Sequence, residues 1–238
     1  KIKYKDYENY IEQVITKIDT PIIRSNVISN QNYTIAMNQK GEGFSKYKDI
    51  YINRYKQTAD EKQGIFIFIK NIKTNKIWSS NYWNKDVNNV VNFMPDRNEQ
   101  EAQIDGIKTK LKTTIAQNDN VEIRRLELEN TGNDEQILEI VSYFEPVLST
   151  KEQDYAHPAF NNLFLVSEYD EKTKALIVKR KARITNQKAI YLATKMSTNS
   201  EIIGDIEYEI DKEKFIGRGN IGIPNMSKNS LPFSKKVG

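Results

Sequence analysis

Apolar and polar residues alternate with a period of two along most of the chain, which predicts β-strands. The clearest case is 107–115, where Ile107, Thr109, Leu111, Thr113 and Ile115 fall on one face and the lysines between them on the other. A break in this phase at Arg124-Arg125 predicts a β-bulge. The predicted strands are 64–70, 77–83, 107–115, 121–129, 136–148, 163–169, 175–181 and 190–196, with a turn at 130–134.

The first twenty residues follow a different period. Their apolar positions recur at spacings of three and four, and Pro21 follows, so a helix is predicted there. We therefore expect an N-terminal helix or linker at 1–20, a β-sandwich at 21–223 and a linker at 224–238. The apolar positions of the predicted helix are Tyr4, Tyr7, Ile11, Val14, Ile15 and Ile18.

Composition narrows the classes of chemistry. The chain has 238 residues, a formal net charge of +4, no Cys and one His. Without Cys there can be no disulfide, thiolate metal site or Cys nucleophile, and one His excludes a His-rich metal site. The chain has no run of 18 apolar residues, so no membrane-spanning helix is predicted. Its weak, mixed charge does not favour nucleic acid as a partner. We expect no metal site and no membrane contact.

Two short segments could carry chemistry. The segment Gly41-Glu42-Gly43-Phe44-Ser45 has the glycines of a phosphate loop but no lysine pattern, so a hairpin turn is the favoured interpretation. His157 could act as a general base, with Asp154 as the nearest acid, or serve only as a structural loop residue. The absence of a nearby nucleophile favours the structural role.

An aromatic-rich region offers faces for stacking on sugar rings, although packing in the core is the alternative for the same residues. Its members are Tyr47, Tyr51, Tyr55, Trp78, Tyr82 and Trp83.

Ordered motif blocks over about 27–238 resemble the amino-terminal part of glycoside hydrolase family 94, formerly glycosyltransferase family 36. The first blocks are a glycine turn, an Arg-aromatic segment, an apolar strand and Trp-Ser. Later blocks, at 122–126, 142–145, 156–160 and 215–219, resemble its cyclic β-1,2-glucan synthase and β-1,2-oligoglucan phosphorylase branch. Lys56 and Asn98 depart from the pattern. The structural motif positions are Gly41, Gly43, Ser45, Asp49, Gly64, Pro158, Gly217 and Gly219.

The resemblance implies an all-β fold, a large antiparallel β-sandwich like that of galactose mutarotase, here with the short N-terminal helix. It also implies that an α/α-barrel follows and holds the catalytic acid and the inorganic-phosphate site. We therefore expect no catalytic residue and no cofactor in this chain. Carbohydrate contacts are expected at Arg54, Tyr55, Trp78, Trp83 and His157.

The function expected from the resemblance is that of a non-catalytic domain of an enzyme acting on β-glucans, by phosphorolysis or chain-length control of β-1,2-glucan. Expected partners are a β-glucan or oligosaccharide, the barrel and a second copy in a homodimer. The location expected is cytoplasmic, with a parent enzyme that can be membrane-associated. Two alternatives stay open: a stand-alone carbohydrate-binding module, and a mutarotase-like enzyme using His157.

Overall fold

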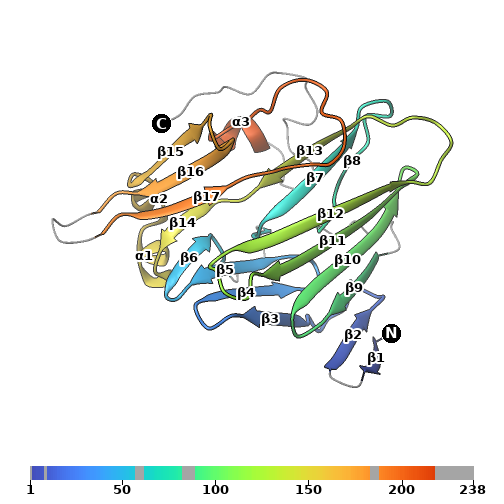
Figure 1. The fold of residues 1–238 in the computed structure, drawn as a ribbon. Helices are drawn as coiled ribbons and strands as arrows, with labels where there is room; N and C mark the ends of the chain where they lie inside the picture. Colours follow the sequence, from blue (N-terminus) through green and yellow to red (C-terminus); the bar gives the residue numbers. More distant parts are fainter. Residues whose placement is uncertain (1, 8–9, 57–61, 82–88, 183–187, 218–238) are drawn as a thin grey trace. The chain divides into compact units, whose positions relative to one another are not determined.

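The computed structural model describes residues 2–7, 10–56, 62–81, 89–182 and 188–217. These residues form antiparallel sheets with three short helices, which confirms the all-β class (Figure 1). The chain divides into two compact units, 1–145 and 146–238.

A six-stranded antiparallel sheet forms one layer of the first unit. Its strands follow the order β1-β2-β9-β10-β11-β12. They are β1 (Ile2–Tyr7), β2 (Tyr10–Ile15), β9 (Asn89–Phe93), β10 (Arg97–Ile104), β11 (Ile107–Ile115) and β12 (Glu122–Asn130).

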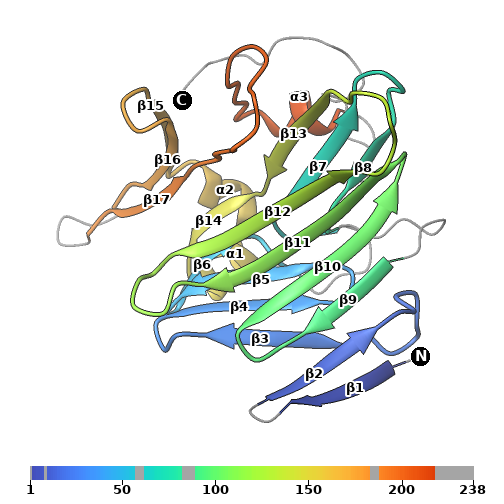
Figure 2. The ribbon, with the colours of Figure 1, turned by 45° about the vertical axis from the view of Figure 1, so that its right-hand side comes forward.

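Two further sets of strands form the opposing layer. Strands β6, β5, β4 and β3 are neighbours in that order, and β13, β7 and β8 form a three-stranded sheet. Figure 2 shows β10–β12 running diagonally across β3–β5. The strands are β3 (Ser25–Ser29), β4 (Tyr33–Asn38), β5 (Gly43–Tyr47), β6 (Ile50–Asn53), β7 (Phe66–Asn71), β8 (Ile77–Ser79) and β13 (Leu138–Tyr143).

The core of the first unit lies between these layers. Ile69 and Trp78 of the three-stranded sheet pack against Ile104 and Ile107 of the six-stranded sheet. Every residue of β7 is buried, as expected for the central strand of its sheet. Each large apolar side chain buried here contributes about 1.5–3 kcal/mol to folding.

Strand β11 follows the predicted alternation. Ile107, Thr109, Leu111 and Thr113 are buried, whereas Lys108 is exposed. The predicted strands at 64–70, 121–129 and 175–181 are also present, with ends shifted by one or two residues.

The N-terminal helix predicted for 1–20 is wrong. Strands β1 and β2 pair with each other there, and β2 pairs with β9 in the register Ile15↔Val91. The apolar residues of this segment follow the helical spacing and not a period of two, so the local pattern does not predict these strands. Pairing with β9 decides the outcome, because it buries Ile15 and Ile18 against Val91 and Phe93.

Two smaller predictions also fail. The register of β11 with β12 is continuous from Ile107↔Asn130 to Ile115↔Glu122, so no bulge occurs at Arg124-Arg125. The strand predicted at 136–148 is interrupted after Tyr143, and within the interruption the main-chain carbonyl of Glu145 accepts a hydrogen bond from the Arg54 amide, at 2.8 Å.

The second unit contains a three-stranded antiparallel sheet and, among its described residues, three short helices. The sheet confirms the strands predicted at 163–169, 175–181 and 190–196. The elements are β14 (Pro146–Ser149), α1 (Lys151–Ala156), α2 (Pro158–Asn162), β15 (Leu165–Asp170), β16 (Ala175–Arg180), β17 (Ile190–Thr194) and α3 (Lys212–Ile216). The predicted linker at 224–238 lies outside the described residues.

Candidate functional site

The glycine-rich segment is the turn of the β4–β5 hairpin, as predicted. Gly41 has φ +80° and Gly43 has φ +155°. A Cβ on Gly41 would lie 1.8 Å from the carbonyl oxygen of Asn81, and one on Gly43 would lie 1.9 Å from that of Ala36. Both positions therefore require glycine because other main-chain atoms approach too closely.

Ser45 follows this turn and joins a buried polar network. Its hydroxyl donates to Glu122 Oε2 at 2.5 Å, and the Tyr33 hydroxyl donates to the same oxygen at 3.0 Å. Arg124 Nε donates to Glu122 Oε1 at 2.5 Å, and Arg124 Nη1 donates to the carbonyl of Ile65 at 2.9 Å. Two motif blocks, at 41–45 and 122–126, therefore meet across the sandwich.

This environment changes the acidity of Tyr33. Burial raises the pKa of its hydroxyl well above the ordinary value, and the charge and hydrogen bond of Glu122 raise it further. Tyr33 therefore stays protonated and remains a hydrogen-bond donor. The network fits a structural role, since its donors and acceptors are matched inside the protein.

Arg54 and Tyr55, both predicted to contact carbohydrate, lie after β6. Arg54 Nη1 forms an ion pair with Glu145 Oε2 at 3.2 Å, and the Tyr143 hydroxyl donates to Glu145 Oε1 at 3.1 Å. The Tyr55 ring centroid lies 5.7 Å from that of Phe44. Arg54 therefore ties the segment after β6 to the segment after β13.

Trp78 is part of the core rather than the surface. Its side chain packs with Ile69, Ile104 and Ile107, and the residue is only 3% exposed. No indole face is open to solvent, so this position does not support the predicted stacking on a sugar ring. Trp83, the other tryptophan predicted to contact carbohydrate, lies outside the described residues.

His157 lies at the corner where α1 ends and α2 begins. The residue is exposed, and its ring makes no hydrogen bond with a described residue. Pro158 occupies the first position of α2, where its missing N–H costs nothing. The acid expected to partner His157, Asp154, is buried and accepts a hydrogen bond from Asn161 Nδ2 at 3.2 Å.

The remaining motif positions are spread over both units. Asp49 is exposed in the turn between β5 and β6, and a Cβ on Gly64 would lie 3.1 Å from the carbonyl oxygen of Gly41. Gly217 ends α3 with φ +66°, and its N–H donates to the Glu213 carbonyl at 2.8 Å. Gly219 lies outside the described residues. Asp49 and Gly217 therefore lie at a turn and at a helix end.

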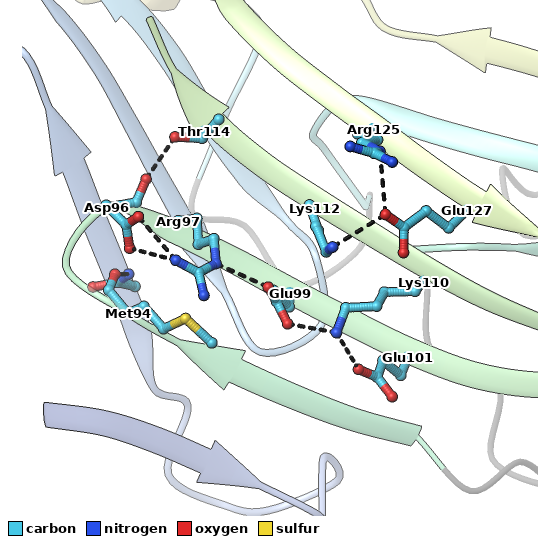
Figure 3. Close-up of polar contacts among 11 residues, drawn as sticks. Met94, Asp96, Arg97, Glu99, Glu101, Lys110, Lys112, Thr114, Arg125 and Glu127 are labelled. Carbon is cyan, nitrogen blue, oxygen red and sulfur yellow. Dashed lines mark hydrogen bonds and ion pairs between the residues drawn. The ribbon is translucent and has the colours of Figure 1, made fainter. Parts of the chain in front are cut away.

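The outer face of β10–β12 carries a ladder of ion pairs (Figure 3). Glu99 accepts from Arg97 Nε at 2.8 Å and from Lys110 Nζ at 2.8 Å, and Lys110 also reaches Glu101 at 2.7 Å. Burial opposes ionisation of Glu99, but its bonds with Lys110 and Arg97 outweigh this effect and lower its pKa. The lysines on this face of β11 are therefore paired with acids.

Sequence reasoning missed the buried partners of Ser45 in the first unit and a buried polar contact in the second unit. Glu122 and Arg124 could have been found by continuing the period of two through β12, which places them on the inner face with Leu126. In the second unit, Arg180 donates a hydrogen bond to Asn161 Oδ1. Neither residue gave a comparable pattern, because the two lie on separate elements.

The described residues hold no group of three or more His, Asp or Glu side chains placed to bind a metal ion. The hollow lined by Gln39, Asn81 and Gln100 has room for no more than about one water molecule. Across the described part of the chain, no helix has the length and apolar character needed to cross a membrane.

Comparison with known proteins agrees with the all-β fold of this chain. The family model for the glycosyl hydrolase 94 supersandwich domain matches residues 8–238. The cyclic beta-(1,2)-glucan synthase NdvB of Rhizobium meliloti (strain 1021) is 25% identical over 197 residues, which cover 81% of this chain and 7% of that protein. The chain thus spans a small part of the length of this relative. Because the family model covers nearly the whole chain, the chain belongs to the glycosyl hydrolase 94 family, in which it corresponds to the supersandwich domain.

Proposed function

We propose that this chain is a non-catalytic domain of an enzyme that acts on β-glucans, by phosphorolysis or chain-length control of β-1,2-glucan. It acts as a scaffold, provides subunit contacts in a homodimer and contacts the glucan. The similarity to a cyclic beta-(1,2)-glucan synthase supports the substrate class. The proposed location is cytoplasmic, with a parent enzyme that can be membrane-associated.

The observation that carries the proposal is how the motif residues are used. Ser45, Glu122 and Arg124 bond to one another in the interior, and Arg54 pairs with Glu145. Side chains committed to such contacts hold elements in place. This pattern supports a domain in which the motif residues maintain the fold.

The chemistry of the parent enzyme belongs to an α/α-barrel in this proposal. There, inorganic phosphate attacks the anomeric carbon while an acid of the barrel protonates the leaving oxygen, so the configuration inverts. The present chain supplies no residue to that step and needs no cofactor.

The mutarotase-like alternative requires His157 and a carboxylate to face one substrate. The exposed ring of His157 and the buried carboxylate of Asp154, which bonds to Asn161, do not favour this arrangement. Replacing His157 by Ala and measuring anomer interconversion by polarimetry tests the alternative. A rate above the uncatalysed one that the substitution abolishes would favour it over the non-catalytic domain.

Two assays of the whole chain test the proposed function. We expect no phosphate release from glucose 1-phosphate with a β-glucan acceptor, compared with a buffer blank. In calorimetric titrations, we expect saturable binding of β-1,2-gluco-oligosaccharides and weaker binding of cello-oligosaccharides. Phosphate release would contradict the non-catalytic role, and equal binding of both series would contradict the β-1,2 preference.

A further inference from the structure

The corner between α1 and α2 presents aromatic and apolar side chains to solvent. Tyr155 is 44% exposed, Phe160 49% and Leu163 74%, and the His157 ring is exposed between them in the sequence. The Lys151 ammonium lies 5.4 Å from the centroid of the Tyr155 ring. Exposed large apolar side chains that form a contiguous patch commonly mark a contact surface.

The corner is held from the interior by a buried polar cluster. Asn161 is fully buried and donates from Nδ2 to Ser149 Oγ at 3.0 Å and to Asp154 Oδ1 at 3.2 Å. Arg180, from β16, donates to Asn161 Oδ1 at 2.5 Å and to the carbonyl oxygens of Val147 and Asn161 at 3.3 Å. These bonds fix the main chain of α2 against the sheet.

The exposed Phe160 ring is connected to the same cluster. It meets the Phe164 ring edge-on, with centroids 5.2 Å apart, and the Arg180 guanidinium carbon lies 5.6 Å from the Phe164 centroid. An exposed ring held in this way loses little conformational entropy when a ligand covers it. The corner therefore has the preorganisation expected of a binding surface rather than of a mobile loop.

The chemistry of the corner matches that of a sugar. A β-linked glucose unit has an apolar C–H face and a rim of hydroxyl groups. Tyr155 and Phe160 supply partly exposed aromatic rings, and the exposed His157 imidazole offers hydrogen bonds to hydroxyls. Both kinds of group lie within six residues of chain.

We propose that the α1–α2 corner is a contact site for β-linked gluco-oligosaccharides, with Tyr155, His157 and Phe160 as its binding residues. The site rests on the proposed function, because it places the glucan contact on a defined part of the chain. It replaces Trp78, whose burial leaves no face for a sugar.

The test locates binding on the intact chain by amide chemical shifts, titrating β-1,2-gluco-oligosaccharides into ¹⁵N-labelled protein. The expected result is shifts concentrated at 151–164. Tyr155→Ala and Phe160→Ala should each weaken binding about two- to tenfold, the range of an aromatic contact. Tyr191→Ala is the matched control, because Tyr191 is an exposed tyrosine with Lys179 5.3 Å from its ring centroid. It should bind as the unmodified chain does.

The outcomes separate this site from the function it rests on. Binding with shifts elsewhere, or binding unchanged by Tyr155→Ala and Phe160→Ala, overturns the site and leaves the glucan contact in place. If the amide shifts change at no residue, both the site and the glucan contact are overturned. Unchanged amide spectra of the free variants away from 151–164 show that a loss of binding does not come from unfolding.

Discussion

At the scale of single residues, the Glu122 carboxylate is the point where the two layers of the first unit are joined. It accepts hydrogen bonds from Tyr33 of β4, Ser45 of β5 and Arg124 of β12. The side chains of Glu122 and Arg124 are 9% and 12% exposed. A charge that is buried to this extent depends on its partner for stability.

We predict that Arg124→Met lowers the free energy of unfolding by about 3 kcal/mol, because it leaves the Glu122 carboxylate buried without its cation. Urea denaturation followed by circular dichroism measures this change. The neighbouring Arg125 provides the control, since it is 71% exposed and bonds only at the surface to Glu127 in the described structure. Arg125→Met should change stability by less than about 0.5 kcal/mol. Equal losses for both variants would refute the structural role of Glu122.

The β4–β5 turn gives a second prediction at this scale. Gly43→Ala should destabilise the chain by about 2 kcal/mol or more, because the new Cβ would lie 1.9 Å from the Ala36 carbonyl oxygen. Gly106→Ala should cost only about 1 kcal/mol, since Gly106 has φ +75° but no atom within 4 Å of a Cβ. Thermal melts of the two variants compare them directly. A smaller loss for Gly43→Ala than for Gly106→Ala would contradict the close approach.

At the scale of elements, the ladder on β10–β12 links neighbouring strands through charge. Glu99 connects Arg97 on its own strand with Lys110 on β11, and Lys112 connects to Glu127 on β12. Opposite charges on directly opposed or diagonal positions stabilise a sheet. The ladder therefore supplies lateral stability on the face that does not line the core.

This ladder predicts a dependence of stability on pH. The pKa of Glu99 is lowered in the folded chain, so its contribution is present above the ordinary glutamate pKa of about 4.3 and is lost as pH falls through the lower folded value. Glu99→Gln should therefore flatten the loss of stability between about pH 5 and pH 3. Urea midpoints across this range test it. Glu129→Gln, which removes an exposed carboxylate 3.8 Å from Lys108, is the control, and at pH 7 it should lower the urea midpoint less than Glu99→Gln does.

The elements show which parts of the fold could be predicted from the sequence. Strand β11 was predictable because one of its faces is largely buried, and β7 because both of its faces are buried. The first twenty residues were not, because partners distant in sequence decide their structure. The same limit applies to the candidate site. The hairpin turn followed from its glycines, but the partners of Ser45 and Arg54 lie 77 and 91 residues away.

At the scale of the whole molecule, exposed apolar side chains extend over the segment between β17 and α3. Ile202 is 56% exposed, Ile203 71% and Ile206 45%. Exposed residues of this kind, placed close together, favour association. This segment is consistent with the proposed role of the chain in subunit contacts.

We predict that the chain self-associates and that replacing Ile202, Ile203 and Ile206 together by Ser weakens this association. Sedimentation velocity over a range of concentrations measures both. A triple substitution at Val27, Val121 and Ile123, which are exposed in the first unit, serves as the control. An equal change in sedimentation for the two triple variants would argue against the 202–206 segment as the contact.

The burial of Trp78 has a consequence for how this protein can be observed. The indole lies in an apolar core, and its Nε1 makes no hydrogen bond with a described residue, so its fluorescence should be shifted to short wavelengths in the folded state. Both tryptophans of the chain precede residue 146, so both belong by sequence to the first unit, and tryptophan emission reports on its unfolding. A denaturation curve recorded by tryptophan fluorescence therefore monitors residues 1–145. Circular dichroism monitors the whole chain, and the difference between the two curves isolates the second unit.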